Sequence, residues 1–80
     1  MAQRETFQIT ANGVPVETRT KWNAANRAVE AKALEAARAE NTVYRLVESE
    51  SRKEGFYHVE GVRVWRGDNG NIIRFEIRRV

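Results

Sequence analysis

Four side chains in the C-terminal part of the chain could form a surface that binds anions and stacks on flat rings. They are Arg63, Trp65, Arg74 and Arg78. Side chains alternate along a strand, and the strands expected here would place all four on one outward sheet face. Arginine contacts phosphate or carboxylate oxygens, and tryptophan stacks on a base or anchors a protein contact. The same face could instead hold ordinary cross-strand Arg–Glu pairs.

A second set of candidate contact residues lies in the alanine-rich stretch 21–40. Arg27, Ala31, Leu34 and Arg38 follow the i, i+4, i+7, i+11 spacing that keeps side chains on one side of a helix. Leu34 is thereby placed between two arginines and away from the core. The stripe is either a solvated face with one stray leucine or a contact surface for a protein or a nucleic-acid backbone.

The residue types do not favour catalysis or metal binding. The chain has no cysteine, which excludes thiolate nucleophiles and thiolate metal ligands. The single histidine, His58, has no acidic partner fixed by spacing, and Glu48, Glu50 and Glu54 belong to a charged stretch. A carboxyl acts as a general acid near neutral pH when burial raises its pKa, and nothing here predicts burial. We therefore expect neither enzymatic activity nor a metal or cofactor.

The length and charge of the chain limit its class. Eighty residues predict one domain, and a net charge of +3 permits nucleic-acid binding without requiring it. A chain of this size buries only about 60–65% of the surface that its unfolded form exposes, so the core is small. No stretch is long and apolar enough to cross a bilayer, and the first twenty residues lack the apolar segment of a secretory signal. We expect a cytoplasmic protein with no membrane partner.

Residues 21–40 predict the helix around which the fold is built. Alanine is the best helix former, and neither Gly nor Pro interrupts the stretch. Thr20 is the expected N-cap and Asn41 the expected stop. At the helical period, the stripe that faces the core consists of Trp22, Ala25, Val29, Ala33 and Ala36. This stripe is mostly small, so the sheet must supply the bulk of the core.

Residues 5–20 predict a β-hairpin, because Asn12-Gly13 favours a two-residue type I′ turn. The resulting register pairs Ala11 with Val14, Ile9 with Val16 and Phe7 with Thr18, and it places these six side chains on one face. Pro15 has no N–H to donate, which predicts that residues 14–19 form an edge strand. The alternative is one longer, bent strand that leads into the helix.

Three more strands are expected after the helix, at residues 42–48, 55–66 and 71–79, with a polar loop at 48–55. In the first of them, either Tyr44 and Leu46 or the neighbouring valines face the core. The apolar pattern of the second changes phase at Gly61, which predicts a β-bulge near Glu60-Gly61. The side chains expected to face the helix are Phe7, Ile9, Val16, Trp22, Val29, Leu46, Val62, Val64, Ile73, Phe75 and Ile77.

Together these elements predict an α+β fold, with one α-helix packed on a four- to five-stranded antiparallel sheet in the order ββαβββ. A small, cysteine-free chain with one alanine-rich helix after a hairpin, and a three-stranded meander that ends in FEIRRV, resembles small phage-encoded accessory proteins such as the type I anti-CRISPR proteins. The resemblance concerns the layout of the whole chain and involves no motif. It implies a protein of the host cytoplasm that inhibits a bacterial nucleoprotein complex by covering one of its surfaces.

We therefore expect a non-enzymatic binding protein that docks on a larger protein or nucleoprotein complex. The candidate contact residues are Arg63, Trp65, Arg74 and Arg78 on the sheet and Arg27, Leu34 and Arg38 on the helix. The alternative is a nucleic-acid-binding domain that uses the same basic and aromatic sheet face. Self-association of this face into a homodimer is a further expectation.

Overall fold

The computed structural model describes residues 5–80 and shows one helix packed on a five-stranded antiparallel sheet, as predicted. The elements in chain order are β1 (Phe7–Ala11), β2 (Val14–Arg19), α1 (Trp22–Ala39), β3 (Tyr44–Glu54), β4 (Tyr57–Gly67) and β5 (Ile72–Arg79). The strands lie in the order β2-β1-β5-β4-β3, so β2 and β3 are the two edges. The prediction that residues 14–19 form an edge strand is confirmed.

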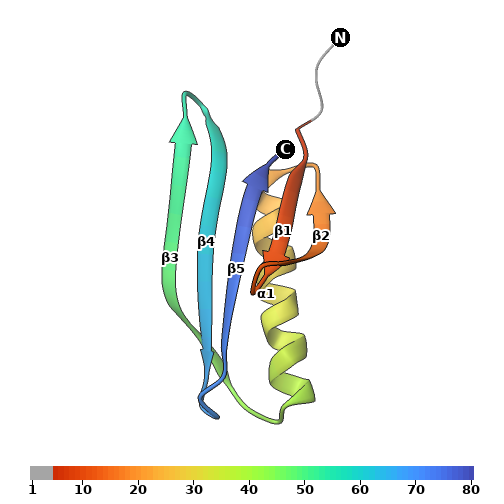
Figure 1. Cartoon of the computed structure of the whole chain (residues 1–80), viewed down its shortest axis with the longest axis vertical. Helices are drawn as coiled ribbons and strands as arrows, with labels where there is room; N and C mark the ends of the chain where they lie inside the picture. The colour runs from red at the N-terminus through yellow and green to blue at the C-terminus, as the bar shows by residue number, and fades with distance from the viewer. Residues whose placement is uncertain (1–4) are drawn as a thin grey trace.

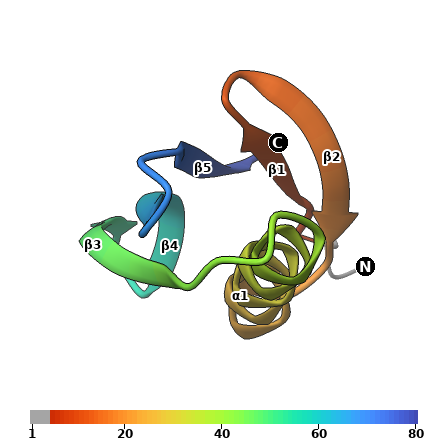
Figure 2. The ribbon, with the colours of Figure 1, turned by 90° about the horizontal axis from the view of Figure 1, so that it is seen from below.

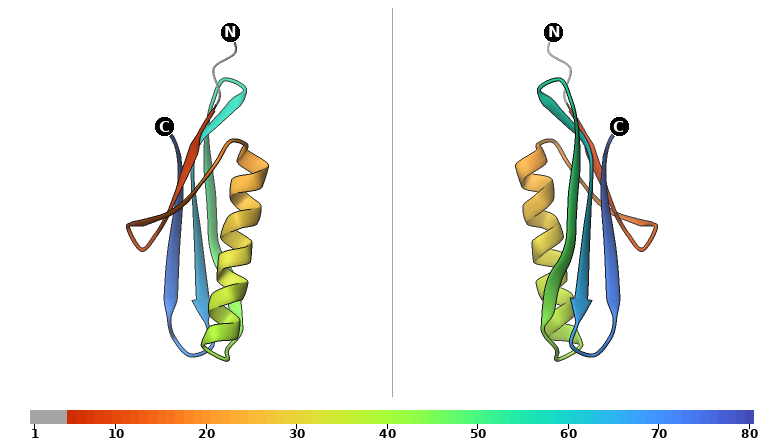
Figure 3. Two further views of the ribbon diagram at one scale, coloured as in Figure 1. Left: turned by 90° about the vertical axis from the view of Figure 1, so that its right-hand side faces the viewer. Right: turned by 90° about the vertical axis from the view of Figure 1, so that its left-hand side faces the viewer.

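The sheet curves around the helix, which leaves the outer side of α1 open (Figures 1 and 2). The molecule is elongated, and the β3–β4 hairpin extends beyond the N-terminal end of α1 (Figure 3). The core lies between α1 and the strands β1 and β5. Its buried side chains are Phe7, Ile9, Ala25, Ala28, Val29, Ala33, Phe75 and Ile77. The helix contributes mainly alanine and the sheet contributes the large side chains, as expected from the sequence.

The first hairpin turns at Asn12-Gly13, where both residues have positive φ values of 50° and 84°, as a type I′ turn requires. Ala11 pairs with Val14 as predicted, but the register then shifts between Ile9 and Thr10, so that Ile9 lies opposite Glu17. The predicted pairings of Ile9 with Val16 and of Phe7 with Thr18 are therefore wrong, since Phe7 lies opposite Arg19. Val16 is exposed rather than part of the core.

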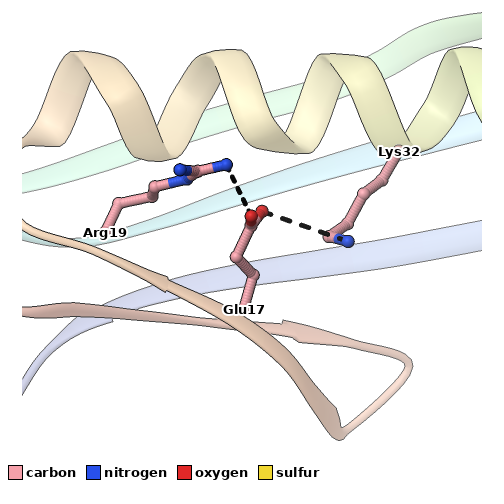
Figure 4. Close-up of polar contacts among 3 residues, drawn as sticks. All are labelled: Glu17, Arg19 and Lys32. Atoms are coloured by element: carbon pink, nitrogen blue, oxygen red, sulfur yellow. Dashed lines mark hydrogen bonds and ion pairs between the residues drawn. The ribbon is translucent and has the colours of Figure 1, made fainter.

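The shift in β2 gives Glu17 a role that the apolar pattern does not show. Its carboxylate lies 2.5 Å from Arg19 Nη2 and 4.0 Å from Lys32 Nζ on α1 (Figure 4). An ion pair thus connects the short edge strand to the helix where an apolar contact was expected. This edge is the periphery of the core, so water can solvate the charges.

The helix begins at Trp22 with Lys21 as its N-cap, and no side chain caps its first turn, so the assignment of this role to Thr20 is wrong. It ends as predicted before Asn41, which adopts a left-handed φ of 50°. Glu40 and Thr42 donate backbone N–H groups to Ala36 and Ala37, which satisfies carbonyl groups of the last turn.

The stretch predicted as a polar loop, 48–55, is a strand up to Glu54, and the turn consists of Gly55-Phe56 alone. Gly55 has a φ of 61°, which glycine adopts without strain in such a short turn. The strand is exposed at every position except Tyr44. An exposed edge strand buries few side chains, so its sequence can be as polar as that of a loop.

The register of β4 differs from the predicted one, and this reverses the direction of several side chains. The irregularity predicted near Glu60-Gly61 is present, but it lies at Val59, which has no partner in β3. From Glu60 onward the ladder with β5 is unbroken, and Gly61 pairs with Ser51 and with Ile77.

Directly opposed residues of neighbouring strands share a sheet face. Arg63 and Trp65 pair with the core residues Phe75 and Ile73, so they lie on the helix side. Val62 and Val64 pair with Glu76 and Arg74 on the open face, and their prediction as core residues is wrong. Leu46 lies on the helix side opposite Trp65 but remains half exposed, because α1 does not cover the edge strand.

Candidate functional site

The predicted binding set on the sheet is divided between the two faces. Arg74 and Arg78 lie on the open face, whereas Arg63 and Trp65 lie on the helix side. The four side chains therefore cannot form one basic and aromatic platform. The apolar pattern of β4 predicts a change of phase at Gly61, and this places the later side chains of the strand on the wrong face.

Arg63 holds the β3–β4 hairpin to the start of the helix. Its guanidinium donates to the carbonyl oxygens of Glu50 and Val62 and, over 2.9 Å, to Ser51 Oγ. It also lies 5.7 Å from the ring centroid of Trp22, within range of a cation–π contact. Burial lowers the pKa of Arg63, but a guanidinium stays charged at any physiological pH. These contacts make Arg63 a structural residue.

Trp22 is the aromatic centre of the same region. Its ring stacks on His58 at 4.4 Å with an interplanar angle of 9°, and it meets Phe7 edge to face at 5.6 Å. A Cβ at Gly61 would lie 2.6 Å from Trp22 Cη2. Only glycine at position 61 therefore leaves room for the ring, which explains this residue without a bulge.

Trp65 packs against the edge of the core and is half-buried. Its indole Nε1 is buried and has no hydrogen-bond partner among residues 5–80. A ring in this position is not available to stack on a nucleic-acid base.

The open face of the sheet carries mixed charge. Along β5, Arg74, Glu76 and Arg78 alternate in sign, and Arg74 Nε lies 3.5 Å from Glu76 Oε1. Val62 and Val64 lie between these charges and the charged edge strand β3. Alternating signs favour cross-strand pairing over a continuous anion-binding surface.

The tip of the β3–β4 hairpin presents the most exposed large apolar side chain of the described residues. Phe56 is 97% exposed, and the adjacent Tyr57 is 56% exposed with the guanidinium of Arg79 5.7 Å from its ring centroid. From the sequence, Phe56 is predicted to lie within a strand at 55–66 and is not among the candidate contact residues. A phenylalanine directly after a glycine, inside an otherwise charged segment, was the available signal.

A cavity of about 510 Å³ lies beside this tip. Its lining residues are Arg52, Lys53, Glu54, Val59, Glu60, Arg78 and Arg79. Arg52 Nη1 lies 3.6 Å from Glu60 Oε1, and Arg79 Nη1 lies 3.8 Å from Glu5 Oε1. The lining carries four cationic side chains and two carboxylates, so the cavity has an excess of positive charge. Within residues 5–80, Lys53, Arg78 and Glu54 have no ion-pair partner. Of the predicted sheet residues, Arg78 alone belongs to it.

The helix residues predicted to contact a partner are all exposed, as expected. Leu34 and Arg38 line a shallow groove of about 470 Å³ at the C-terminal end of α1, together with Ala37, Asn41, Thr42, Val43 and Tyr44. Arg27 lies apart from them, beside Trp22 and His58. The groove therefore joins two of the three helix residues to the start of β3.

Glu40 fastens the end of α1 to both neighbouring loops. Its carboxylate accepts hydrogen bonds from the Tyr44 hydroxyl, Asn69 Nδ2 and Asn71 Nδ2. The amides of Asn71 and Asn69 and the Tyr44 hydroxyl lower the pKa of Glu40. Burial, and then Glu40 itself, raise the pKa of Tyr44. These hydrogen bonds connect the C-terminal end of α1 to Tyr44 and to the β4–β5 turn, so the cluster stabilises the fold.

Within residues 5–80, no group of three or more His, Asp or Glu side chains is arranged to hold a metal ion, and no helix is long and apolar enough to cross a membrane. No protein-family model matches the chain, and no curated protein or solved structure shows significant similarity to it.

Proposed function

We propose that this chain is a non-enzymatic binding protein that docks on a larger protein through the tip of its β3–β4 hairpin. The observation that carries the proposal is the near-complete exposure of Phe56 at the end of an arm that extends beyond the helix. Phe56 lies in a two-residue turn held on both sides by paired strands. Such a turn presents its side chain in a fixed direction, which lowers the entropy lost on binding.

Burial of a phenylalanine side chain in a partner contributes about 1.5–3 kcal/mol, enough for one residue to dominate a small contact. The side chains around the tip define the chemistry of that contact. Lys53 and Arg78 supply positive charge in the cavity beside Phe56, and Glu54 directly precedes the turn. We propose that the partner offers an apolar pocket whose rim is acidic toward the cavity beside the tip.

The layout that resembles small phage-encoded proteins adds a more specific proposal. An arm with an apolar tip and a charged flank would inhibit a bacterial nucleoprotein complex if it occupied a surface that the complex needs. Of the residues predicted on the sheet, Arg78 lines the cavity beside the tip and would extend this contact.

A second candidate function is direct binding of nucleic acid. The four cations around the cavity, Arg52, Lys53, Arg78 and Arg79, favour it, because they could contact neighbouring phosphates while Phe56 stacks on a base. The carboxylates of Glu54 and Glu60 in the same cavity disfavour it.

The experiment compares capture by the wild-type chain, by Phe56→Ser and by a matched control, Val14→Ser. Val14 is a 61%-exposed apolar residue directly after the turn of the other hairpin. Tagged chains are incubated with nuclease-treated lysates of candidate host cells. We expect wild-type protein and the control to retain the same protein in stoichiometric amount, and Phe56→Ser to lose it.

Equal retention by all three chains would contradict a role for Phe56. Loss of all binding after nuclease treatment, with a gel shift of single-stranded DNA or RNA that weakens steeply as salt rises, would favour the nucleic-acid alternative.

A further inference from the structure

We infer that the chain forms a weak symmetric dimer in which α1 packs antiparallel against α1 of a second copy. The contact is centred on Leu34, which is 55% exposed on the outer side of the helix. Glu30 and Arg38 lie four residues before and after it and are also exposed. Side chains at this spacing share one helix face, so the three exposed residues form one stripe. Within residues 5–80, the strands lie on one side of α1 and leave its other side uncovered (Figure 2).

The stripe is complementary to itself in the antiparallel direction. When Leu34 lies opposite the partner's Leu34, residues equally far before and after it face each other. Glu30 then meets the partner's Arg38, and Arg38 meets the partner's Glu30. The two ion pairs lie about 6 Å on either side of the symmetry axis, at 1.5 Å per residue.

The residues three positions from Leu34 fit the same arrangement. Ala31 and Ala37 lie opposite each other across the axis, and both are small enough to let two helices approach to about 8–10 Å. Val43 is 54% exposed and lines the same groove as Leu34 and Ala37. It extends the apolar surface from Leu34 toward the C-terminal end of α1.

Within one chain these charges do not satisfy each other. Glu30 and Arg38 are separated by two helical turns, about 12 Å along the axis. Among residues 5–80, neither of them has an ion-pair partner. A second copy would therefore provide partners that the fold does not.

The size of the contact predicts a weak dimer. An 18-residue helix is about 27 Å long and 10 Å wide, a footprint of roughly 270 Å² on each copy. The pair covers about 540 Å², well below the roughly 1,200 Å² of a standard stable interface. Association is therefore expected to depend on concentration.

The long edge strand β3 offers a less suitable route to self-association. The ladder between β3 and β4 shifts between Leu46 and Glu48, leaving Val47 without a partner, and β3 carries several charges. Bulges and charged side chains are features that discourage edge-to-edge pairing.

The test measures molar mass by sedimentation or light scattering across about 10 μM to 1 mM. We expect the mass of wild-type protein to rise from 9.2 kDa toward twice that value as concentration increases. Glu30→Arg and Arg38→Glu should each weaken association at least tenfold, because each places like charges opposite one another. An equimolar mixture of the two variants should associate again, because every facing pair then has opposite signs.

Glu35→Arg is the matched control, since it makes the same charge change on an exposed helix position outside the stripe. It should associate as the wild type does, and circular dichroism should show all variants folded. The inference is overturned if wild-type protein stays at 9.2 kDa throughout, if Glu30→Arg dimerises like Glu35→Arg, or if the mixture remains monomeric.

Discussion

Replacement of Gly61 by alanine should destabilise the protein, mainly because the added Cβ would clash with the ring of Trp22. The added Cβ would lie 2.6 Å from Trp22 Cη2 and 3.3 Å from the carbonyl oxygen of Glu50. The first distance is well inside van der Waals contact. The ring cannot easily retreat, because it stacks on His58 and packs edge-on against Phe7.

The expected loss can be estimated from opposing contributions. Overpacking a well-filled site costs about 1–3 kcal/mol. Alanine also restricts the unfolded chain, which returns about 0.4–1 kcal/mol. The net loss is therefore about 0–2.6 kcal/mol, with a midpoint of roughly 1.3 kcal/mol. In a domain of this size each kcal/mol lowers Tm by roughly 4–8 °C. Chemical denaturation monitored by the fluorescence of Trp22 and Trp65 measures the stability.

A double-mutant cycle attributes the effect to the contact. In a Trp22→Leu background the ring atom is gone, so Gly61→Ala should be neutral or slightly stabilising. Ser49→Ala is the control on the same sheet face, at an exposed position opposite Arg63, and should change stability by less than about 0.5 kcal/mol. If Gly61→Ala lowers the free energy of unfolding just as much in the Trp22→Leu background, the contact between Gly61 and the ring of Trp22 is not the cause.

Three further predictions concern the helix end, the edge strand and the hairpin tip. The pKa of Glu40 is lower in the folded chain than in the unfolded chain, so its stabilising contribution is present above the ordinary carboxyl range and is lost as pH falls; unfolding measured across pH 3–7 should be less pH-dependent in Glu40→Gln than in the wild type. Lys32→Ala should lower the free energy of unfolding by no more than about 0.5 kcal/mol in a denaturant titration, because its pair with Glu17 is long and partly exposed; a loss above about 1 kcal/mol would show that the pair is stronger than its geometry indicates. Phe56→Ser should leave Tm unchanged in a thermal melt, because an almost fully exposed side chain has little packing to lose.

The sequence was sufficient for the fold where local chemistry and periodicity agree. Asn12-Gly13 has no good alternative to a tight turn, and Pro15 marks an edge strand. The alanine-rich stretch is helical at any plausible packing. These features predict the first hairpin and the helix, and the apolar runs after the helix predict the remaining strands.

The sequence was insufficient where tertiary contacts decide the register. Val16 was expected inside because valine is apolar, but the shift in β2 lets Glu17 reach Lys32. The change of apolar phase at Gly61 predicts a bulge there. The reason for the glycine is instead that it leaves room for the ring of Trp22 at the start of α1. A one-residue error in β4 then moved Arg63 and Trp65 to the wrong face.

The candidate site was only partly predictable for the same reason. Exposure of the helix stripe followed from its spacing, and Leu34 and Arg38 do lie together in one groove. The prominence of Phe56 depends on the length of the β3–β4 arm, and a stretch as polar as 48–54 does not show the alternation that would reveal a strand.

The most direct test of the proposed function replaces Phe56 with a photoreactive benzoylphenylalanine and irradiates the full chain in candidate host cells. Docking through the hairpin tip predicts a covalent adduct with one protein of defined mass. The same substitution at Val14 should yield no such adduct. Two results would contradict docking through the tip. One is the absence of an adduct from position 56 in cells whose nuclease-treated lysate yields the partner protein. The other is the same adduct from both positions.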